Sequence, residues 1–225
     1  MTDKSKIWGF LCAVCVCLGI PVFPGCSGGN GDVAGGLETT NGVVVTAGSG
    51  ELRGNTVPGT RIIVSDTGYV PKEISTLPFA DTVYAEANGE FAVIGIPAGM
   101  YNLIAQKSDQ CDGCIIWNLE VDSSADGSFS DSSRFVSLVT LAVLVQLDTL
   151  PQKESTAFIR GTTLQAVTSA DGSAGITGIP EGVYTIEAYY IDTKNLLDPK
   201  IYSAHIGSIP VDTTGTVILD LQLQE

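Results

Sequence analysis

Residues 87–105 read ANGEFAVIGIPAGMYNLIA, and residues 170–188 read ADGSAGITGIPEGVYTIEA, which is the same pattern 83 positions further along the chain. The two copies align without a gap. Both contain an Asn/Asp-Gly pair, an apolar stretch, an Ile-Pro-x-Gly turn and an alternating strand that carries a tyrosine. Chance rarely places three glycines, a proline and a tyrosine in the same order, so we interpret the pattern as an internal repeat. Its composition predicts that each copy is a β-hairpin.

Turn residues dominate the repeat, and each of them has a structural explanation. We expect Gly99 and Gly182 to need a positive φ angle, which glycine adopts without strain. The prolines would fix the entry to the turn, and the tyrosine rings would pack over the edge of a sandwich while their hydroxyls bond to backbone or water. The motif positions predicted to be structural are Gly89, Pro97, Gly99, Tyr101, Gly172, Pro180, Gly182 and Tyr184.

The composition limits the classes of function. Of the 225 residues, 44% are hydrophobic, which is enough for the cores of one or two ordinary domains. The 25 acidic and 11 basic residues give a net charge of −14, and such a charge repels phosphate backbones and anionic lipids. We therefore expect no nucleic-acid partner. The sequence also lacks a glycine-rich phosphate loop between a strand and a helix, and we expect no cofactor.

The amino-terminal residues resemble a bacterial lipoprotein signal. Two lysines precede an apolar run over residues 7–22, and a small residue is followed by Cys26. The run is shorter than the ~20 apolar residues of a membrane-spanning helix, so residues 1–25 are expected to be a cleaved signal peptide. The resemblance implies that Cys26 carries lipid and anchors the chain in a membrane. Ser27 replaces the Asp that would indicate inner-membrane retention, which implies the outer membrane or cell surface.

The remaining chain divides by composition. Residues 26–41 are rich in glycine and lack apolar periodicity, which predicts a flexible tether. Two tandem β-sandwich domains are expected at residues 42–141 and 142–225, so the fold class is all-β. Residues 135–150 are apolar enough for a helix, but their Val and Thr content favours two strands joined at a bend. Further strands are expected at residues 42–47, 60–65, 81–87 paired with 91–96, 100–106, 114–121, 156–160, 164–169, 202–206 and 216–224, with connections at 48–58 and 123–133.

The repeated motif resembles the carboxypeptidase regulatory-like family of prealbumin-type β-sandwiches. The similarity covers residues 88–103 and 171–186, where an Asn/Asp-Gly turn, a strand ending in Gly-Ile-Pro and a Gly-x-Tyr strand follow one another. Related sandwiches include the collagen-adhesin B-type repeats and the starch-binding-like group. The resemblance implies Ig-like or prealbumin-like sandwiches that serve as stalk, spacer, adhesion or glycan-contacting modules, and a fold of this kind does not by itself assign a function.

Apart from Cys26, which would carry lipid, two cysteines remain after the signal, and their spacing allows three interpretations. Cys111 and Cys114 form a C-x-x-C pair in an exported chain, which most simply predicts a local disulfide that closes a short loop. A thioredoxin-like redox pair would need a βαβ setting, which the strand-rich surroundings do not offer. A zinc site would need two more soft ligands, and His205 is the single histidine.

Catalytic and metal-binding patterns are sparse. His205 lies in an alternating strand without a nucleophile elbow, which favours a surface histidine over a general base. Asp122, Asp126 and Asp131 could supply oxygen ligands for calcium, but they lack the glycine and terminal Glu of a calcium loop and are better explained as solvated acids. We therefore predict neither an enzyme nor a metal site.

Two classes of function remain. In the first, the protein is a non-catalytic envelope or surface lipoprotein with a structural, spacer or adhesion role and envelope proteins as partners. In the alternative, one sandwich is a starch-binding-like carbohydrate-binding module that contacts polysaccharide. Such a module needs exposed aromatic rings, and the candidates are Trp117, Tyr189, Tyr190 and Tyr202. Tyr189 and Tyr190 would point to opposite faces of one strand, which leaves one of the two available.

Overall fold

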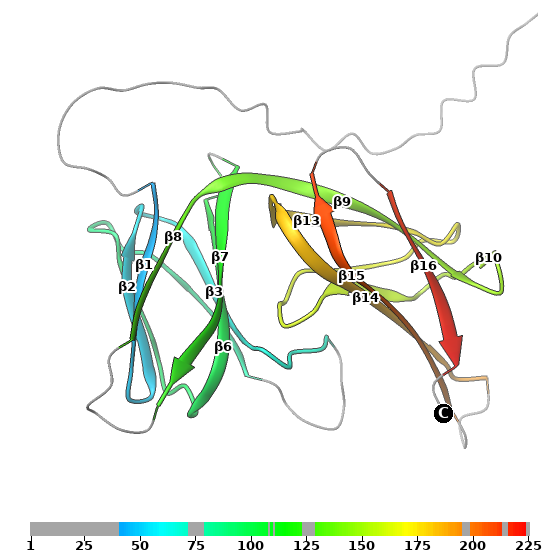
Figure 1. Ribbon diagram of the computed structural model, residues 1–225, viewed down its shortest axis with the longest axis horizontal. Coiled ribbons are helices and arrows are strands. Elements are labelled where there is room, and N and C mark those ends of the chain that lie inside the picture. Colours follow the sequence, from blue (N-terminus) through cyan, green and yellow to red (C-terminus); the bar gives the residue numbers. More distant parts are fainter. Residues whose placement is uncertain are drawn as a thin grey trace, which may run out of the picture.

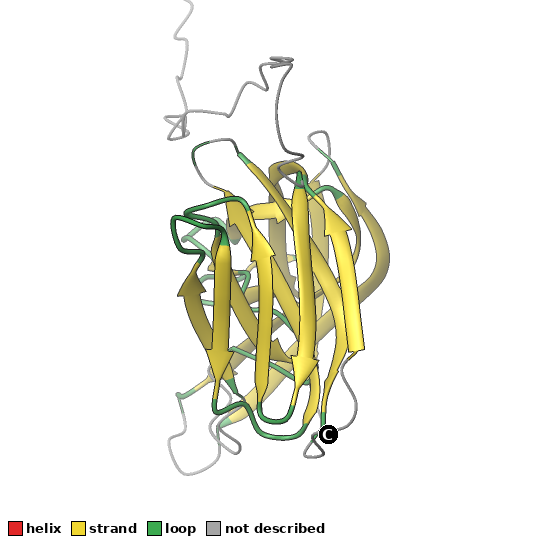
Figure 2. Ribbon diagram, turned by 90° about the vertical axis from the view of Figure 1, so that its left-hand side faces the viewer, coloured by secondary structure: helices red, strands yellow, loops and turns green. Residues whose placement is uncertain are grey.

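The computed structural model describes residues 41–71, 79–107, 109, 111–122, 129–194, 199–212 and 216–223. Within these residues it is all-β, with sixteen strands and no helix, which confirms the predicted fold class (Figure 2). No helix of the described chain is long and apolar enough to cross a membrane. The predicted signal peptide, the lipidated Cys26 and nearly all of the predicted tether lie outside the described residues.

The first half, residues 41–135, is a sandwich of two antiparallel layers (Figure 1). Alternating apolar residues form its core, because successive side chains of a strand point to opposite faces. Val43 and Val45 from one layer and Leu103 and Leu119 from the other are almost completely buried in one hydrophobic cluster. The first layer has the order β5-β2-β1-β8, with β1 Gly42–Gly48, β2 Glu51–Thr56, β5 Glu90–Ile94 and β8 Phe129–Arg134. The second layer contains β3 Arg61–Asp66, β4 Ala80–Tyr84, β6 Gly99–Lys107 and β7 Asp112–Val121.

The second half, residues 136–223, continues the second layer into a larger sheet of twelve strands. Its own hydrophobic cluster includes Val143, Ile159, Ile176 and Ile186. The final strand β16 (Thr216–Leu223) is unusual because it pairs in parallel with β9 (Val136–Leu147), while its two register pairs with β15 (Lys200–Val211) are antiparallel. The strands are β9 Val136–Leu147, β10 Leu150–Pro151, β11 Thr156–Ile159, β12 Gln165–Val167, β13 Ser173–Pro180, β14 Gly182–Asp192, β15 Lys200–Val211 and β16 Thr216–Leu223.

In each motif copy the Ile-Pro-x-Gly turn forms an arch, which joins two strands that do not pair with each other, so the predicted hairpins are wrong. In the first copy, β5 pairs with β2, whereas β6 pairs with β3 and β7. In the second copy, β13 pairs with β9, whereas β14 pairs with β11 and β15. The Ile-Pro-x-Gly turn therefore carries the chain across the core, and its two strands face each other through their side chains. The strands on either side of the Asn88-Gly89 turn also lie in different sheets, because β4 pairs with β3.

Positive φ angles occur in the motif at other glycines than those predicted. Gly95 has a φ of 75° and Gly178 a φ of 72°, and both precede the Ile-Pro step. Neither Gly99 nor Gly182 has a positive φ, so that prediction is wrong. Gly182 instead leaves room for the following tyrosine, because a Cβ there would lie 3.0 Å from the Tyr184 hydroxyl.

Three further expectations need correction. Strand β2 lies within the stretch predicted as a turn-rich connection, and β8 lies within the predicted polar loop 123–133. Strand β9 is continuous over 12 residues, in place of two strands joined at a bend. Figure 1 shows it crossing from the first half to the second. The predicted domain boundary between residues 141 and 142 falls within this strand and stays a prediction.

Candidate functional site

The two halves meet on the outer face of the sheet formed by β3, β6 and β7. Ile63 is 2% exposed and Ile104 is fully buried, yet both belong to the hydrophobic cluster of the second half. Their neighbours Ile62 and Leu103 point the other way, into the cluster of the first half. This sheet therefore has an apolar core on each face, which explains why both of its faces are rich in aliphatic residues.

A polar contact fixes the junction beside these isoleucines. The carbonyl oxygen of Gly161 accepts hydrogen bonds from Ser65 Oγ at 3.0 Å and from Asn102 Nδ2 at 2.8 Å. The Oδ1 atom of Asn102 accepts a bond of 3.0 Å from the backbone N–H of Asn118. The N–H of Gly161 donates to the carbonyl of Tyr69 at 3.2 Å. Gly161 has a φ of 71°, and a Cβ there would lie 2.6 Å from Asn102 Nδ2, so only glycine fits.

The second copy of the motif also contacts the first half. Gln106 Nε2 donates a bond of 2.7 Å to the carbonyl of Gly178, the glycine with positive φ that precedes the turn. Tyr189 donates its hydroxyl to the carbonyl of Pro71 from the first half. Because these bonds come from strands separated by more than 70 positions in sequence, the relative placement of the two halves is specified by several independent contacts.

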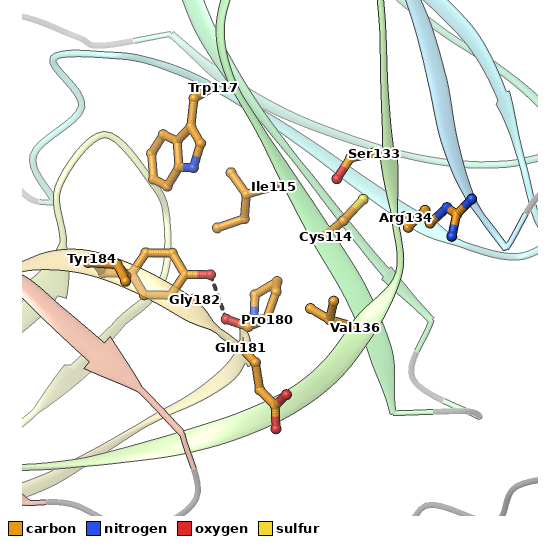
Figure 3. Close-up of a pocket in the computed structure, with 11 residues that line it drawn as sticks. Cys114, Ile115, Trp117, Ser133, Arg134, Val136, Pro180, Glu181, Gly182 and Tyr184 are labelled. Carbon is orange, nitrogen blue, oxygen red and sulfur yellow. Dashed lines mark hydrogen bonds between the residues drawn. The ribbon is translucent and has the colours of Figure 1, made fainter.

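A groove of about 180 Å³ opens at the same junction (Figure 3). One wall comes from β7, the end of β8 and the start of β9, and the other comes from the Pro-Glu-Gly turn of the second motif copy. The rings of Trp117 and Tyr184 both line it, with centroids 6.2 Å apart and their planes tilted by 55°. The Tyr184 hydroxyl donates to the carbonyl of Pro180. The lining residues are Cys114, Ile115, Trp117, Ser133, Arg134, Val136, Pro180, Glu181, Gly182, Val183 and Tyr184.

The electrostatics of the groove do not favour nucleophilic chemistry. Burial raises the pKa of the Cys114 thiol to about 12, although a hydrogen bond with Ser133 acts in the opposite direction. Burial also raises the pKa of Tyr184 to about 12, and the neighbouring Cys114 adds to this shift. Both groups are therefore protonated at neutral pH, and a protonated thiol is a poor nucleophile and metal ligand. The described residues hold no group of three or more His, Cys, Asp or Glu that could bind a metal ion.

The predicted disulfide between Cys111 and Cys114 is wrong. Cys114 is a free thiol and is 2% exposed, because its position on β7 points it into the core of the first half. Cys111 lies before that strand with a φ of 54°, and its disulfide bond does not go to Cys114. The alternation of a strand thus separates two cysteines that a tight loop would have brought together.

The predicted glycan-contacting rings lie in three different places. Trp117 is 39% exposed and packs against Tyr184 in the groove. Tyr189 packs edge-on against Phe158, with centroids 6.0 Å apart. Tyr190 and Tyr202 form a pair with centroids 6.3 Å apart, and both are half-buried against the second core. The four candidates therefore do not form one aromatic platform.

The other candidate residues are dispersed as well. His205 is exposed on β15, opposite Glu187 of β14. The carboxylate of Glu187 accepts a hydrogen bond of 2.8 Å from Arg160. On β8, Asp131 Oδ1 accepts a hydrogen bond from the backbone N–H of Ser132. Asp126 lies outside the described residues.

The two motif tyrosines make equivalent contacts. Tyr101 donates a bond of 2.8 Å to the carbonyl of Pro97, four residues earlier, as Tyr184 does to Pro180. Phe79 packs edge-on against the Tyr101 ring with centroids 5.6 Å apart, and Trp117 occupies the corresponding place beside Tyr184. Trp117 therefore acts as a packing partner of the second motif copy.

The sequence interpretation missed the polar residues of the junction. Asn102 and Gln106 are buried on β6, which the sequence reads as an alternating strand. Buried amides need hydrogen-bond partners, so polar residues in a strand with both faces covered are the one signal that could have marked this contact.

Comparisons with known proteins give little similarity. No protein-family model matches the sequence, and no curated protein matches it. The crystal structure of GBS52, the minor pilin of the gram-positive pathogen Streptococcus agalactiae, is 13% identical, with a TM-score of 0.30 over 76% of this chain and 87% of that chain. The Bacillus anthracis TIE protein is 12% identical, with a TM-score of 0.23 over 84% of this chain and 41% of that chain. These scores are too low to carry an argument about function, and the predicted family resemblance stays a prediction.

Proposed function

We propose that the chain is a non-catalytic structural or adhesion module of the cell surface, in which two β-sandwich units are held in a fixed relation. The observation that carries this proposal is the junction. The buried isoleucines and the bonds to Gly161 and Gly178 join the halves through both apolar and polar contacts. A module that projects a contact surface away from a membrane benefits from such a rigid connection, since free hinge motion would spread the position of that surface.

The chemistry of the described residues supports a role without catalysis. The groove holds a thiol and a phenol that both stay protonated at neutral pH. The net charge of −14 makes nucleic acid and anionic lipid unfavourable partners. The carbohydrate-binding alternative lacks support, because its candidate rings are divided among three places.

The location at the surface rests on the amino-terminal sequence. Residues 1–25 resemble an export signal, and lipid on Cys26 would anchor the folded part through the glycine-rich residues 26–41. We place the module at the outer membrane or cell surface, with envelope proteins as its partners.

Labelling of intact cells with a membrane-impermeant amine reagent tests this location. The side chains of Lys153 and Lys194 are 64% and 87% exposed, whereas that of Lys107 is only 11% exposed. We expect label at the two exposed lysines and little at Lys107, which acts as an internal control for the folded state. A Cys26→Ser variant should leave the membrane fraction. Label that appears only after the cells are lysed would refute a surface location.

A further inference from the structure

The groove at the junction lies beside two strand edges that no strand of the described residues pairs with. Strand β7 pairs with β6 along its length, but it pairs with β9 only through Asp112 and Gly113. From Cys114 onward, no described strand pairs with its other side. Strand β8 ends the four-stranded sheet, so it too has one unpaired edge in the described chain. Unpaired edges present backbone N–H and C=O groups that an added strand can satisfy.

Apolar side chains are exposed along this edge. Val183 is 64% exposed, Trp117 is 39% exposed and Val136 is 38% exposed, and all three line the groove. Exposed apolar side chains that gather around a groove mark contact surfaces more often than isolated ones do. The groove of about 180 Å³ is smaller than the roughly 300–1,000 Å³ of a small-molecule site, so it suits a side chain of a larger ligand.

The charge at the groove indicates the chemistry of its ligand. Arg134 is exposed at the end of β8, and none of the ion pairs among the described residues involves it. Figure 3 shows Glu181 beside Pro180 and Arg134 at the rim of the groove, with its guanidinium directed away from Trp117 and Tyr184. Because Glu181 also lines the groove and would repel a ligand carboxylate, the charges favour a carboxylate only on the side of Arg134.

We propose that this groove binds an extended peptide segment of a protein partner, which adds as a strand to the free edge of β7. Backbone hydrogen bonds to β7 would supply affinity. One apolar side chain of the peptide would lie against Trp117 and Val183, and a carboxylate would lie near Arg134. The inference goes beyond the structural role, because it assigns a ligand class to a site that a pure spacer would not need.

The edge of β4 offers a matched control within the same molecule. Strand β4 is the last strand of its sheet, and its Tyr84 is 64% exposed. Tyr84 is absent from the lining of the groove. Nonspecific peptide addition would affect both edges alike, whereas specific binding would affect β7 alone.

Hydrogen exchange of the full chain tests the proposal. The probes are short synthetic peptides that alternate valine and threonine, prepared with either a free carboxylate or an amide at the C-terminus. We expect the carboxylate peptide to protect backbone amides of residues 114–117 and to leave those of β4 unchanged. Val183→Glu should weaken this protection roughly tenfold. Arg134→Gln should remove the preference for the carboxylate, and Tyr84→Glu should have no effect.

Several outcomes would overturn the proposal. Absence of protection with every peptide would exclude strand addition at this edge, and equal protection of β4 and β7 would show nonspecific association. Protection that neither Val183→Glu nor Arg134→Gln alters would place the peptide elsewhere. Protection of residues 114–117 by a soluble oligosaccharide, without any effect of the peptides, would assign the groove to glycan. None of these results depends on where the chain is located in the cell, so the proposed surface location is tested separately by the labelling of intact cells.

Discussion

Replacing Asn102 with alanine should weaken the junction without touching either hydrophobic core directly. The Asn102 side chain is 2% exposed and makes two hydrogen bonds, one to the Gly161 carbonyl and one from the Asn118 N–H. The Gly161 carbonyl keeps its bond to Ser65 in the variant. Water can reach the Asn118 amide, because Asn118 is exposed. The substitution therefore removes two bonds but leaves no buried group entirely without a partner.

The size of the effect follows from these contacts. Each lost bond contributes about 1 kcal/mol, and the small cavity left by the amide adds to this, so we expect a loss of about 2–3 kcal/mol in the free energy of unfolding. Urea unfolding monitored by circular dichroism measures it. Asn55→Ala is the control, since Asn55 is exposed and its bond to Asn88 is long at 3.5 Å. We expect the control to change stability by less than about 0.5 kcal/mol.

A double variant tests whether the contacts share one acceptor. Removing Ser65 Oγ alone leaves the Gly161 carbonyl bonded to Asn102, but removing both side chains leaves it without a donor from the first half. We expect Ser65→Ala together with Asn102→Ala to cost about 1 kcal/mol more than the sum of the single variants. Additive effects, or an Asn102→Ala variant as stable as the native chain, would refute the view that this contact fixes the junction.

Three further predictions concern single residues. Gly95→Ala should lower the free energy of unfolding by about 1–2 kcal/mol, which is the strain of a left-handed backbone. Gly178→Ala should lower it further, because its Cβ would lie 2.8 Å from Gln106 Nε2. Chemical denaturation measures both variants, and equal losses would contradict the docking of Gly178. Cys114 should resist a thiol-directed maleimide at pH 8 until the chain unfolds, as followed by peptide mass mapping, and fast labelling of the folded chain would contradict its burial. Hydrogen bonds from Ser169 and Ser173 lower the pKa of Asp171 to about 2. The contribution of Asp171 to stability is therefore present above pH 4 and is lost as the pH falls towards 2. If the stability difference between the native and Asp171→Asn chains stays constant over this range, the prediction is wrong.

The sequence was sufficient to predict many of the strands, but not β2, β8 or the partners of the strands. Alternation and turn residues indicated the strands that include Val43, Phe91 and Leu103, because these signals are local. Whether the chain turns back beside itself or crosses the core after Ile-Pro-x-Gly depends on which distant strand offers a free edge. Both arrangements need a glycine, a proline and apolar strands, so the hairpin and the arch have the same local signature. The pairing of β5 with β2 settles the difference through contacts far apart in sequence.

The candidate site was less predictable for a related reason. Trp117 was predicted to contact glycan because it is aromatic, but its ring packs against Tyr184 of the second motif copy. The spacing of Cys111 and Cys114 suggested a loop, whereas β7 begins between them and its alternation turns Cys114 into the core. The exposed edge of β7 depends on where β9 departs, which no local pattern records.

The two motif copies also differ at the position that packs into the junction. Ile104 and Glu187 occupy equivalent positions of the repeat, 83 residues apart. Ile104 is fully buried in the junction, whereas Glu187 forms an ion pair of 2.8 Å with Arg160 on the outer face of the second half. Glu187 also lies opposite His205 on the neighbouring strand. Burying the Glu187–Arg160 ion pair would carry a desolvation cost that the aliphatic face around Ile104 does not have. The second half therefore presents an ion pair at the motif position where the first half presents a buried isoleucine.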